Sequence, residues 1–483
     1  MHATLINEAL KSKRPYLFLT GTPGIGKTTA IVNFLKQAQQ KREGFLFLYI
    51  SPRKQVNLDI IQKFREDTGE PACADAFALT ANSIIIRNNY AKKTVHYYSE
   101  KRNDTFVENG VTFIHADSDE AKKQQVKARN LEEIQEGLLI DKGEHISGVL
   151  DSLCSALNVT LEKPLAKAII GTVAIQSLKR LNNAEGSTIH HFKTIFKGIF
   201  NEQGQVIPHK MAMLSQNIKH LFIMIDEITG DESGVEFLHG LHSFLVQRDL
   251  LKSEQINIKV IVADASIVDP KIINKHLADI TYEPDKIYFR RVTSASQQSF
   301  PLSRETFLFK REQATVINAN AYPASNLHIT YKIGVDALQY DEETFTERNK
   351  HLEQQLKQRI ITDIINTLDT DKIPQQLVYI QDKRRLAELI QEIKKIRGTF
   401  EPNKDYLEIH ANISERDKQD IKEFRKTARV VFMTASASRG SLSPRPPRFL
   451  LIFLIFKLSR TSWRFYRLFI VDAAGIATRK KKS

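Results

Sequence analysis

The sequence predicts an α/β fold in which buried strands alternate with helices around parallel sheets. A glycine-rich segment joins an apolar run to the start of a helix near the N-terminus, at Gly21 to Thr29. Further apolar runs follow, each ending in a cluster of polar residues, and a second block of the chain repeats the alternation. This pattern is typical of parallel sheets with crossover helices. The carboxyl ends of such strands form the ligand crevice, so the polar clusters are expected to meet at one edge.

The glycine-rich segment is a complete phosphate-binding loop of the form G-x-x-x-x-G-K-T. It follows the apolar run Tyr16 to Thr20, and a helix begins around Ala30. The backbone N–H groups of such a loop point at phosphate oxygens, the lysine reaches the β- and γ-phosphates, and the hydroxyl after it ligates Mg²⁺. We therefore interpret the segment as a real phosphate-binding loop rather than a chance glycine-rich turn, and we expect ATP and Mg²⁺ as cofactors. The residues of the loop are Gly21, Thr22, Pro23, Gly24, Ile25, Gly26, Lys27, Thr28 and Thr29.

Four more strands complete the first predicted domain, residues 1–300. They are expected at Phe45–Ile50, Ile169–Ala174, Leu221–Ile225 and Ile256–Val262. Residues 82–168 interrupt the alternation, and we read them as an insertion that contains a helix at 131–139. An insertion on the loop edge could touch substrate, but a peripheral decoration is the favoured interpretation.

Two acidic residues, Asp226 and Glu227, close the strand Leu221–Ile225. Beside a phosphate loop, Asp226 would hold Mg²⁺ through its water shell, and Glu227 would orient or deprotonate the attacking water. A solvated acidic pair at a strand end is the alternative. The upstream phosphate loop favours the catalytic interpretation.

A second α/β domain is predicted at residues 301–440, with no second phosphate loop. Its alternating and apolar runs predict four strands and three helices. The strands are expected at Leu327–Ile333, Gln376–Ile380, Tyr406–His410 and Arg429–Met433, and the helices at Glu342–Leu368, Lys383–Ile396 and Glu415–Phe424.

The composition is that of a globular protein without a structural metal or a disulfide framework. The chain has 483 residues, of which 42% are hydrophobic and 26% charged. Its two cysteines, Cys73 and Cys154, lie far apart without histidines at metal spacing, which favours a cytoplasmic protein. The N-terminus carries no apolar signal segment, and the longest apolar run, 449–456, is shorter than a membrane span. No membrane partner is expected.

Positive charge is concentrated in the last 43 residues, 441–483. The whole chain carries a net charge of +14, and this tail holds ten Lys and Arg residues but a single acid, Asp472. The tail also contains a proline cluster and the chain's only tryptophan, Trp463. We favour the hypothesis that the tail is translated from a shifted reading frame. A genuine basic tail that binds nucleic acid or an acidic membrane surface is the alternative.

The ordered motifs resemble those of superfamily 2 DNA and RNA helicases, over roughly residues 15–440. Gly21 to Thr29 matches motif I, and Ile225-Asp226-Glu227 matches motif II, although Ile228-Thr229 departs from the usual forms. Ala263 to Ser266 occupies the motif III position but differs from the common S-A-T. In the second block, His410 to Arg416 resembles the family's H-x-x-[LM]-S stretch, and Val430 to Gly440 resembles motif V.

The resemblance implies two RecA-like lobes with ATP bound at motifs I and II and nucleic acid running across both lobes. It places Arg53 of the motif Ia segment, Gln176 and Thr434 against nucleic acid, and Arg439 and Gly440 near the nucleotide. The family's motif VI, whose arginines reach the γ-phosphate, does not follow Gly440 in this sequence. Loss of such an arginine finger reduces turnover by about 10³- to 10⁵-fold.

The sequence therefore predicts an ATP-dependent nucleic-acid helicase or translocase, impaired in this form by the missing motif VI. Two alternatives stay open: a P-loop ATPase of the AAA or signalling type that acts on protein partners, and a non-catalytic helicase remnant that binds nucleotide or DNA without turnover. The pattern specifies neither DNA nor RNA, nor an oligomeric state.

Overall fold

In the structure, a computed structural model, the chain folds into two compact units. One is formed by Met1–Val126 and His145–Ala321, and the other contains Tyr322–Ser483. The structure describes residues 2–21, 25–51, 54–81, 93–119, 121, 148–175, 188–228, 232–264, 302–319, 328–334, 345–369, 375–380, 383–409, 423–424, 427–434, 448–454 and 466–472.

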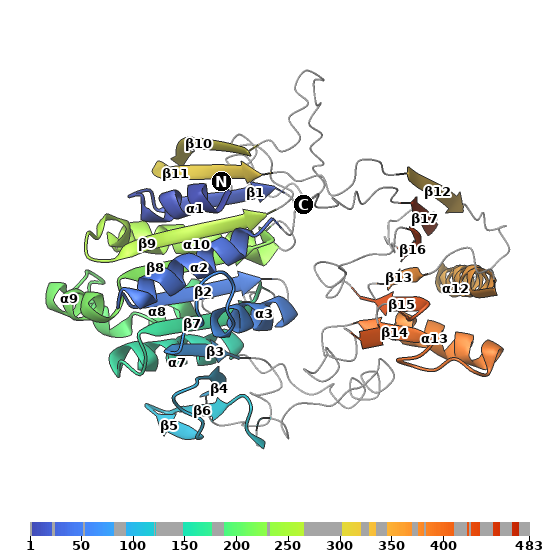
Figure 1. The fold of residues 1–483 in the computed structure, drawn as a ribbon, viewed down its shortest axis with the longest axis horizontal. Coiled ribbons are helices and arrows are strands. Elements are labelled where there is room, and N and C mark those ends of the chain that lie inside the picture. Colours follow the sequence, from blue (N-terminus) through green and yellow to red (C-terminus); the bar gives the residue numbers. More distant parts are fainter. Residues whose placement is uncertain are drawn as a thin grey trace, which may run out of the picture. The chain divides into compact units, whose positions relative to one another are not determined.

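The first unit is built on a large sheet that is parallel over its centre. Its strands lie in the order β10-β11-β1-β9-β8-β2-β7-β3-β4-β6-β5 (Figure 1). The seven strands from β11 to β3 run parallel to one another. Their bounds are β11 Glu312–Ala319, β1 Tyr16–Gly21, β9 Asn257–Asp264, β8 His220–Asp226, β2 Phe45–Ser51, β7 Ala168–Ala174 and β3 Ala76–Thr80.

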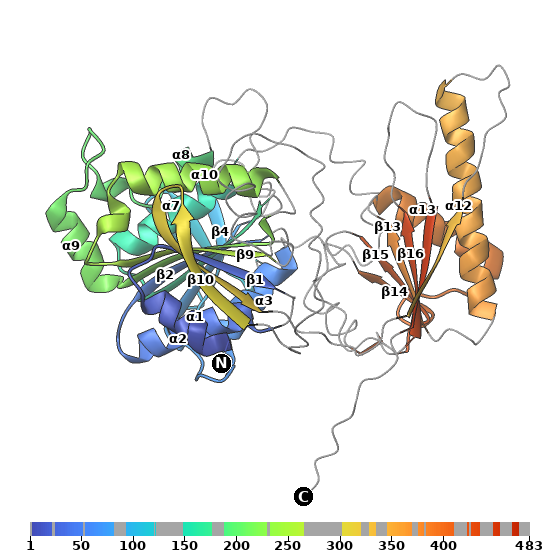
Figure 2. The ribbon, with the colours of Figure 1, turned by 90° about the horizontal axis from the view of Figure 1, so that it is seen from above.

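Helices cover both faces of this sheet, which explains why its central strands are continuously apolar. Figure 2 shows α1, α2 and α3 on one face and α7, α8 and α10 on the other. The bounds of the helices are α1 His2–Lys11, α2 Lys27–Gln40, α3 Lys54–Arg65, α7 Val149–Glu162, α8 Thr188–Thr194, α9 Pro208–Asn217 and α10 Glu232–Gln247, with 3₁₀ turns at Lys197–Ile199 and Leu250–Lys252.

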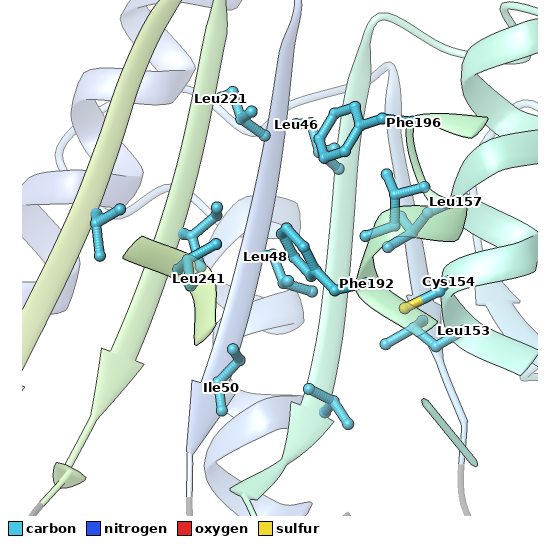
Figure 3. Close-up of a cluster of buried hydrophobic side chains, with 14 of the residues drawn as sticks. Leu46, Leu48, Ile50, Leu153, Cys154, Leu157, Phe192, Phe196, Leu221 and Leu241 are labelled. Atoms are coloured by element: carbon cyan, nitrogen blue, oxygen red, sulfur yellow. The ribbon is translucent and has the colours of Figure 1, made fainter. Parts of the chain in front are cut away.

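Alternate residues of each central strand enter two separate cores. On β1, Tyr16 and Phe18 pack with the core under α7, α8 and α10, whereas Leu17 and Leu19 pack with the core under α1 and α2. Figure 3 shows part of the first core, in which leucines of β2 meet Leu157 of α7 and Phe192 of α8. The sheet is thus packed on both faces, and this packing fixes the positions of its strands.

Part of the predicted insertion, residues 82–168, extends this sheet. The strands β4, β6 and β5 continue it beyond β3, with β4 antiparallel to β3. Helix α7 packs in the central core, where Leu153 and Leu157 are fully buried, and is therefore no peripheral decoration. The helix expected at 131–139 lies outside the described residues. The bounds are β4 Lys93–Tyr98, β5 Phe106–Glu108 and β6 Val111–His115.

The first unit reaches further along the chain than the predicted boundary at residue 300. The hairpin of β10 (Leu302–Phe309) and β11 belongs to the first sheet, because β11 pairs in parallel with β1 from Tyr16↔Ala314 to Gly21↔Ala319. The unit consequently ends at Ala321. Without β11, the edge of β1 would expose its unpaired backbone groups at the start of the phosphate loop.

The second unit has a smaller sheet, in the order β12-β17-β16-β13-β15-β14. Strands β16, β13, β15 and β14 run parallel, whereas β17 is antiparallel to both of its neighbours. Helices α12 and α13 pack on it through buried residues such as Ile364 and Ile390. The bounds are β12 His328–Gly334, α12 Phe345–Asp369, β13 Gln376–Ile380, α13 Lys383–Arg397, β14 Tyr406–Ile409, β15 Val430–Met433, β16 Arg448–Leu454 and β17 Tyr466–Asp472.

Two strands of the second sheet, β16 and β17, come from the predicted tail, residues 441–483. Strand β16 pairs with β13 from Gln376↔Leu450 to Ile380↔Leu454, and β17 pairs with β16 over its whole length. Ladder hydrogen bonds are made by the main chain, so an apolar run of either origin can fill this place. The shifted reading frame stays a prediction, which the other two forward frames of the gene would test.

The predicted α/β class with mostly parallel sheets is confirmed, and the arrangement is consistent with two RecA-like domains. Among the described residues, no helix combines the length and the apolar character needed to span a membrane.

Substituting Gly21 by Ala is expected to destabilise the first unit by about 2–5 kcal/mol, because overpacking and a strained backbone add. Gly21 ends β1 with φ +115°, and a Cβ there would lie 1.8 Å from the carbonyl oxygen of Ala319. Urea unfolding measures the loss. Gly110→Ala is the matched control, since Gly110 also has a positive φ (+75°) but open space around it. Equal losses in the two variants would show that backbone strain alone, and not the contact with β11, is responsible.

A buried lysine makes the stability of the first unit dependent on pH. Lys259 of β9 is 1% exposed, and its Nζ donates hydrogen bonds to the carbonyl oxygens of Ser12 and Arg14 (2.6 Å for the latter). Burial lowers its pKa to about 8. The folded state therefore binds fewer protons than the unfolded state above this pH.

We expect the free energy of unfolding to rise as pH increases from about 8 toward the ordinary lysine pKa of about 10.4. Urea unfolding of the wild type and of Lys259→Met at several pH values in this window isolates the contribution of Lys259. The difference between the two proteins should grow with pH in favour of the wild type. A difference that stays constant would contradict a lowered pKa.

Candidate nucleotide-binding site

The carboxyl ends of the central strands bring the predicted nucleotide-binding residues of the first unit to one edge. Strand β1 ends at Gly21, β8 at Asp226 and β9 at Asp264. In register, Thr20 of β1 lies opposite Asp264, and Asp226 lies opposite Ala263 of β9. Thr20 and Asp264, which are 244 positions apart in the sequence, are therefore neighbours here.

Helix α2 begins at this edge and presents an uncapped N-terminus. Its N-cap is Gly26, with φ +84°, which has no side chain to cap the first turn. The first turn contains no acidic residue, and the amide of Ala30 makes the first helical hydrogen bond, to Gly26 (2.9 Å). Unpaired N–H groups and the helix dipole make such an end an anion site. Of the loop itself, Thr22, Pro23 and Gly24 lie outside the described residues.

Lys27, the first residue of α2, is half-buried among acids. Its Nζ donates a hydrogen bond to the carbonyl oxygen of Gly21 (2.9 Å). Burial lowers the pKa of Lys27, while Asp226, Asp264 and Glu227 raise it. The ammonium group is thus held at the point where strand β1 ends and where three carboxylates converge.

Both oxygens of the Asp226 carboxylate accept hydrogen bonds within the protein. Oδ2 accepts from the hydroxyl of Tyr49 on the neighbouring strand β2 (2.6 Å), and Oδ1 accepts from the backbone N–H of Glu227 (3.1 Å). Burial raises the pKa of Asp226, the Tyr49 hydrogen bond and Lys27 lower it, and Glu227 raises it. Removing the Tyr49 hydroxyl or the Lys27 ammonium group would therefore raise the pKa of Asp226 and favour its protonated form.

Glu227 has a left-handed backbone, which is uncommon for a residue with a side chain of this size. Its φ is +53°, and its N–H also donates to the carbonyl oxygen of Ala263 (2.7 Å). The next residue, Ile228, is fully buried. These contacts hold a conformation that costs about 1–3 kcal/mol, and such conformations cluster at functional sites.

The remaining predicted site residues are placed as follows. Thr28 and Thr29 are half-buried in the first turn of α2. Thr434 belongs to the second unit, where its side chain is 2% exposed and its N–H donates to the carbonyl oxygen of Ile409 (3.2 Å). Arg53, Gln176, Arg439 and Gly440 lie outside the described residues.

Two residues join this site that the sequence did not assign to it, Tyr49 and Asp264. Asp264 stands within the segment at the motif III position, and its signal was a single acid at the end of an apolar strand. Tyr49 stands inside a buried apolar run, where its hydroxyl was the only indication of a polar partner. Both residues reach the site because their strands, β2 and β9, lie on either side of β8 in the sheet.

The donors at this edge fit a nucleotide-bound Mg²⁺. Among the described residues, no group of three or more His, Cys, Asp and Glu side chains is arranged to hold a metal ion by itself. Mg²⁺ is usually held by one or two protein oxygens together with substrate phosphates and waters. The Thr28 hydroxyl in the first turn of α2 and the Asp226 carboxylate at the end of β8 are oxygen donors that would suit such an ion, Thr28 as a ligand and Asp226 through the water shell.

The sequence matches no protein-family model and no curated protein. Among solved structures, the chain is similar to a DEAD box protein from the hyperthermophile Methanococcus jannaschii, with 13% identity and a TM-score of 0.30 over 91% of this chain and 73% of that one. It is also similar to a Dbp5 variant from S. cerevisiae bound to a Gle1 variant and IP6, with 10% identity and a TM-score of 0.32 over 90% and 68% of the two chains. Identities and TM-scores this low assign no role to any residue, so the roles of the site residues are argued from their own geometry.

Proposed function

We propose that this protein is an ATP-dependent nucleic-acid translocase or helicase. The observation that carries the proposal is the meeting of Lys27 with Asp226 and Glu227 at the uncapped N-terminus of α2. A cation, two acids and the N-terminus of a helix are parts that phosphoryl transfer from a nucleoside triphosphate uses.

Each residue has a distinct role in the proposed reaction. Lys27 and the first-turn N–H groups of α2 bind the phosphates, and Thr28 and Asp226 hold Mg²⁺. Glu227 orients the attacking water and accepts its proton. When bound, Mg²⁺ neutralises the charge that develops on the phosphate oxygens.

The coupling to nucleic acid is proposed from the two α/β units and the order of the motifs along the chain. We place the contacts to the sugar–phosphate backbone at Arg53 and Gln176, with little base readout. Thr434 gives weaker support, because its side chain is buried in the second unit. We propose from the resemblance of Val430 to Gly440 to helicase motif V that Arg439 and Gly440 act near the nucleotide.

ATP hydrolysis, measured with and without single- and double-stranded DNA and RNA, tests the proposal. Stimulation by any of these nucleic acids is the expected result. Hydrolysis that ignores all of them would favour an ATPase that acts on protein partners. Nucleotide binding without hydrolysis under every condition would favour a non-catalytic remnant, in line with the missing motif VI.

A further inference from the structure

Tyr49 reaches the acidic pair from a strand that carries none of the nucleotide-binding motifs. Its hydroxyl donates a hydrogen bond of 2.6 Å to Oδ2 of Asp226. Strand β2 lies beside β8, and Tyr49 pairs in register with Met224 of β8. Register partners in a sheet share a face, and residues two apart on a strand do so as well. Tyr49, Met224 and Asp226 therefore lie in a row on one face.

The phenol ring of Tyr49 has little freedom to move. Its side chain is fully buried. Its ring centroid lies 6.1 Å from that of Phe47, and the centroid of Phe47 lies 5.8 Å from that of Phe64 on α3. A ring packed in this way cannot change its rotamer without opening the core. The hydroxyl is therefore a fixed donor.

Two donors hold the carboxylate of Asp226, one on the neighbouring strand β2 and one in the next residue of the chain. Tyr49 occupies one site on Oδ2, and the N–H of Glu227 occupies one site on Oδ1 at 3.1 Å. A carboxylate offers about four acceptor sites in all, so both oxygens keep capacity for further partners. The two hydrogen bonds fix the plane of the carboxylate and leave sites for water.

We propose that Tyr49 is a positioning residue for Asp226, and that it orients the carboxylate toward the water shell of nucleotide-bound Mg²⁺. This inference rests on the proposed function, in which Asp226 holds Mg²⁺. Groups that hydrogen-bond to a metal-binding carboxylate typically contribute about 10- to 100-fold to metal affinity or activity. Tyr49 would do so without touching metal or nucleotide.

Equilibrium binding of a fluorescent, non-hydrolysable ATP analogue to Tyr49→Phe, with Mg²⁺ and with EDTA, tests the inference. Wild-type protein is expected to bind the analogue more tightly with Mg²⁺. In Tyr49→Phe, this gain should fall by about 10-fold, while the affinity in EDTA stays within about twofold of wild type. The substitution removes one oxygen atom and keeps the buried ring.

Tyr16→Phe is the matched control. Tyr16 is equally buried in the same sheet, but its hydroxyl contacts Nδ1 of His242 (2.7 Å). It should leave the Mg²⁺-dependent gain unchanged. Thermal unfolding of both variants supplies a second measurement.

Three results would overturn the inference. A full Mg²⁺-dependent gain in Tyr49→Phe would remove any role for the hydroxyl, while the proposed function would stand. Equal losses of affinity with and without Mg²⁺, together with a lower melting temperature than Tyr16→Phe, would make Tyr49 a structural residue. A wild-type protein without any gain from Mg²⁺ would refute the proposed role of Asp226 and the inference with it.

Discussion

Replacing Lys27 by Ala is expected to reduce ATP hydrolysis by about 10²- to 10³-fold or more, the loss found when one preorganised charge partner of a transition state is removed. Lys27 lies where the carboxylates of Asp226, Asp264 and Glu227 converge, and each of them favours its charged form. Without this cation, the site would present mainly negative charge to a triphosphate. Steady-state hydrolysis in the presence of the most effective nucleic acid measures kcat.

The same substitution at the other end of helix α2 is the control. Lys41 is exposed just after the last residue of α2, Gln40. Lys41→Ala removes an equal charge from the protein without approaching the acids, so its kcat should match that of wild type. If Lys27→Ala kept more than a tenth of the wild-type kcat, hydrolysis would come from another site or from a contaminating ATPase.

The central strands could be predicted because their surroundings impose one simple pattern. Runs such as Phe45–Ile50 and Leu221–Ile225 are buried on both faces, so they are continuously apolar and bounded by polar residues. The observed strands differ from the predicted ones by one or two residues at their ends. The phosphate loop could be located for the same reason, since its chemistry fixes residue types at fixed spacings.

The hairpin of β10 and β11 was assigned to the wrong domain because its residues do not carry that pattern. Strand β10 is an edge strand with exposed Ser303, Glu305 and Thr306, and β11 opens with the polar pair Glu312-Gln313. An edge strand needs few apolar residues, so its partner cannot be recognised from periodicity alone. Pairing with β1, almost 300 residues earlier, decides its place.

Tyr49 and Asp264 escaped prediction for a related reason. Motifs are read along the chain, whereas the site is assembled across it: Tyr49 and Asp226 are 177 residues apart. Their contact follows from β2 and β8 being neighbours, although five strands, β3 to β7, separate them in sequence order. Lys27, Asp226 and Glu227 could be predicted because each carries its own local signal beside a strand end.

Glu227→Gln is expected to lower kcat by about 10²- to 10⁴-fold, the usual contribution of a positioned general base. The amide keeps the size and the hydrogen-bonding reach of the carboxylate but cannot take a proton from water. The unusual backbone at Glu227 (φ +53°) is held by hydrogen bonds from its N–H to the carbonyl oxygen of Ala263 and to Oδ1 of Asp226, and the substitution leaves these groups in place. Single-turnover hydrolysis with Mg²⁺ and saturating ATP measures the chemical step.

Binding separates Glu227 from its neighbour Asp226. Because Glu227 is proposed to act on water and not on the metal, Glu227→Gln should bind the fluorescent ATP analogue as tightly as wild type, with the full gain from Mg²⁺. Asp226→Asn should lose most of that gain, since a neutral amide is a poorer partner for a hydrated cation than a carboxylate. Two adjacent residues would then affect different steps. If Glu227→Gln lost the Mg²⁺-dependent gain and Asp226→Asn kept it, the two roles would have to be exchanged.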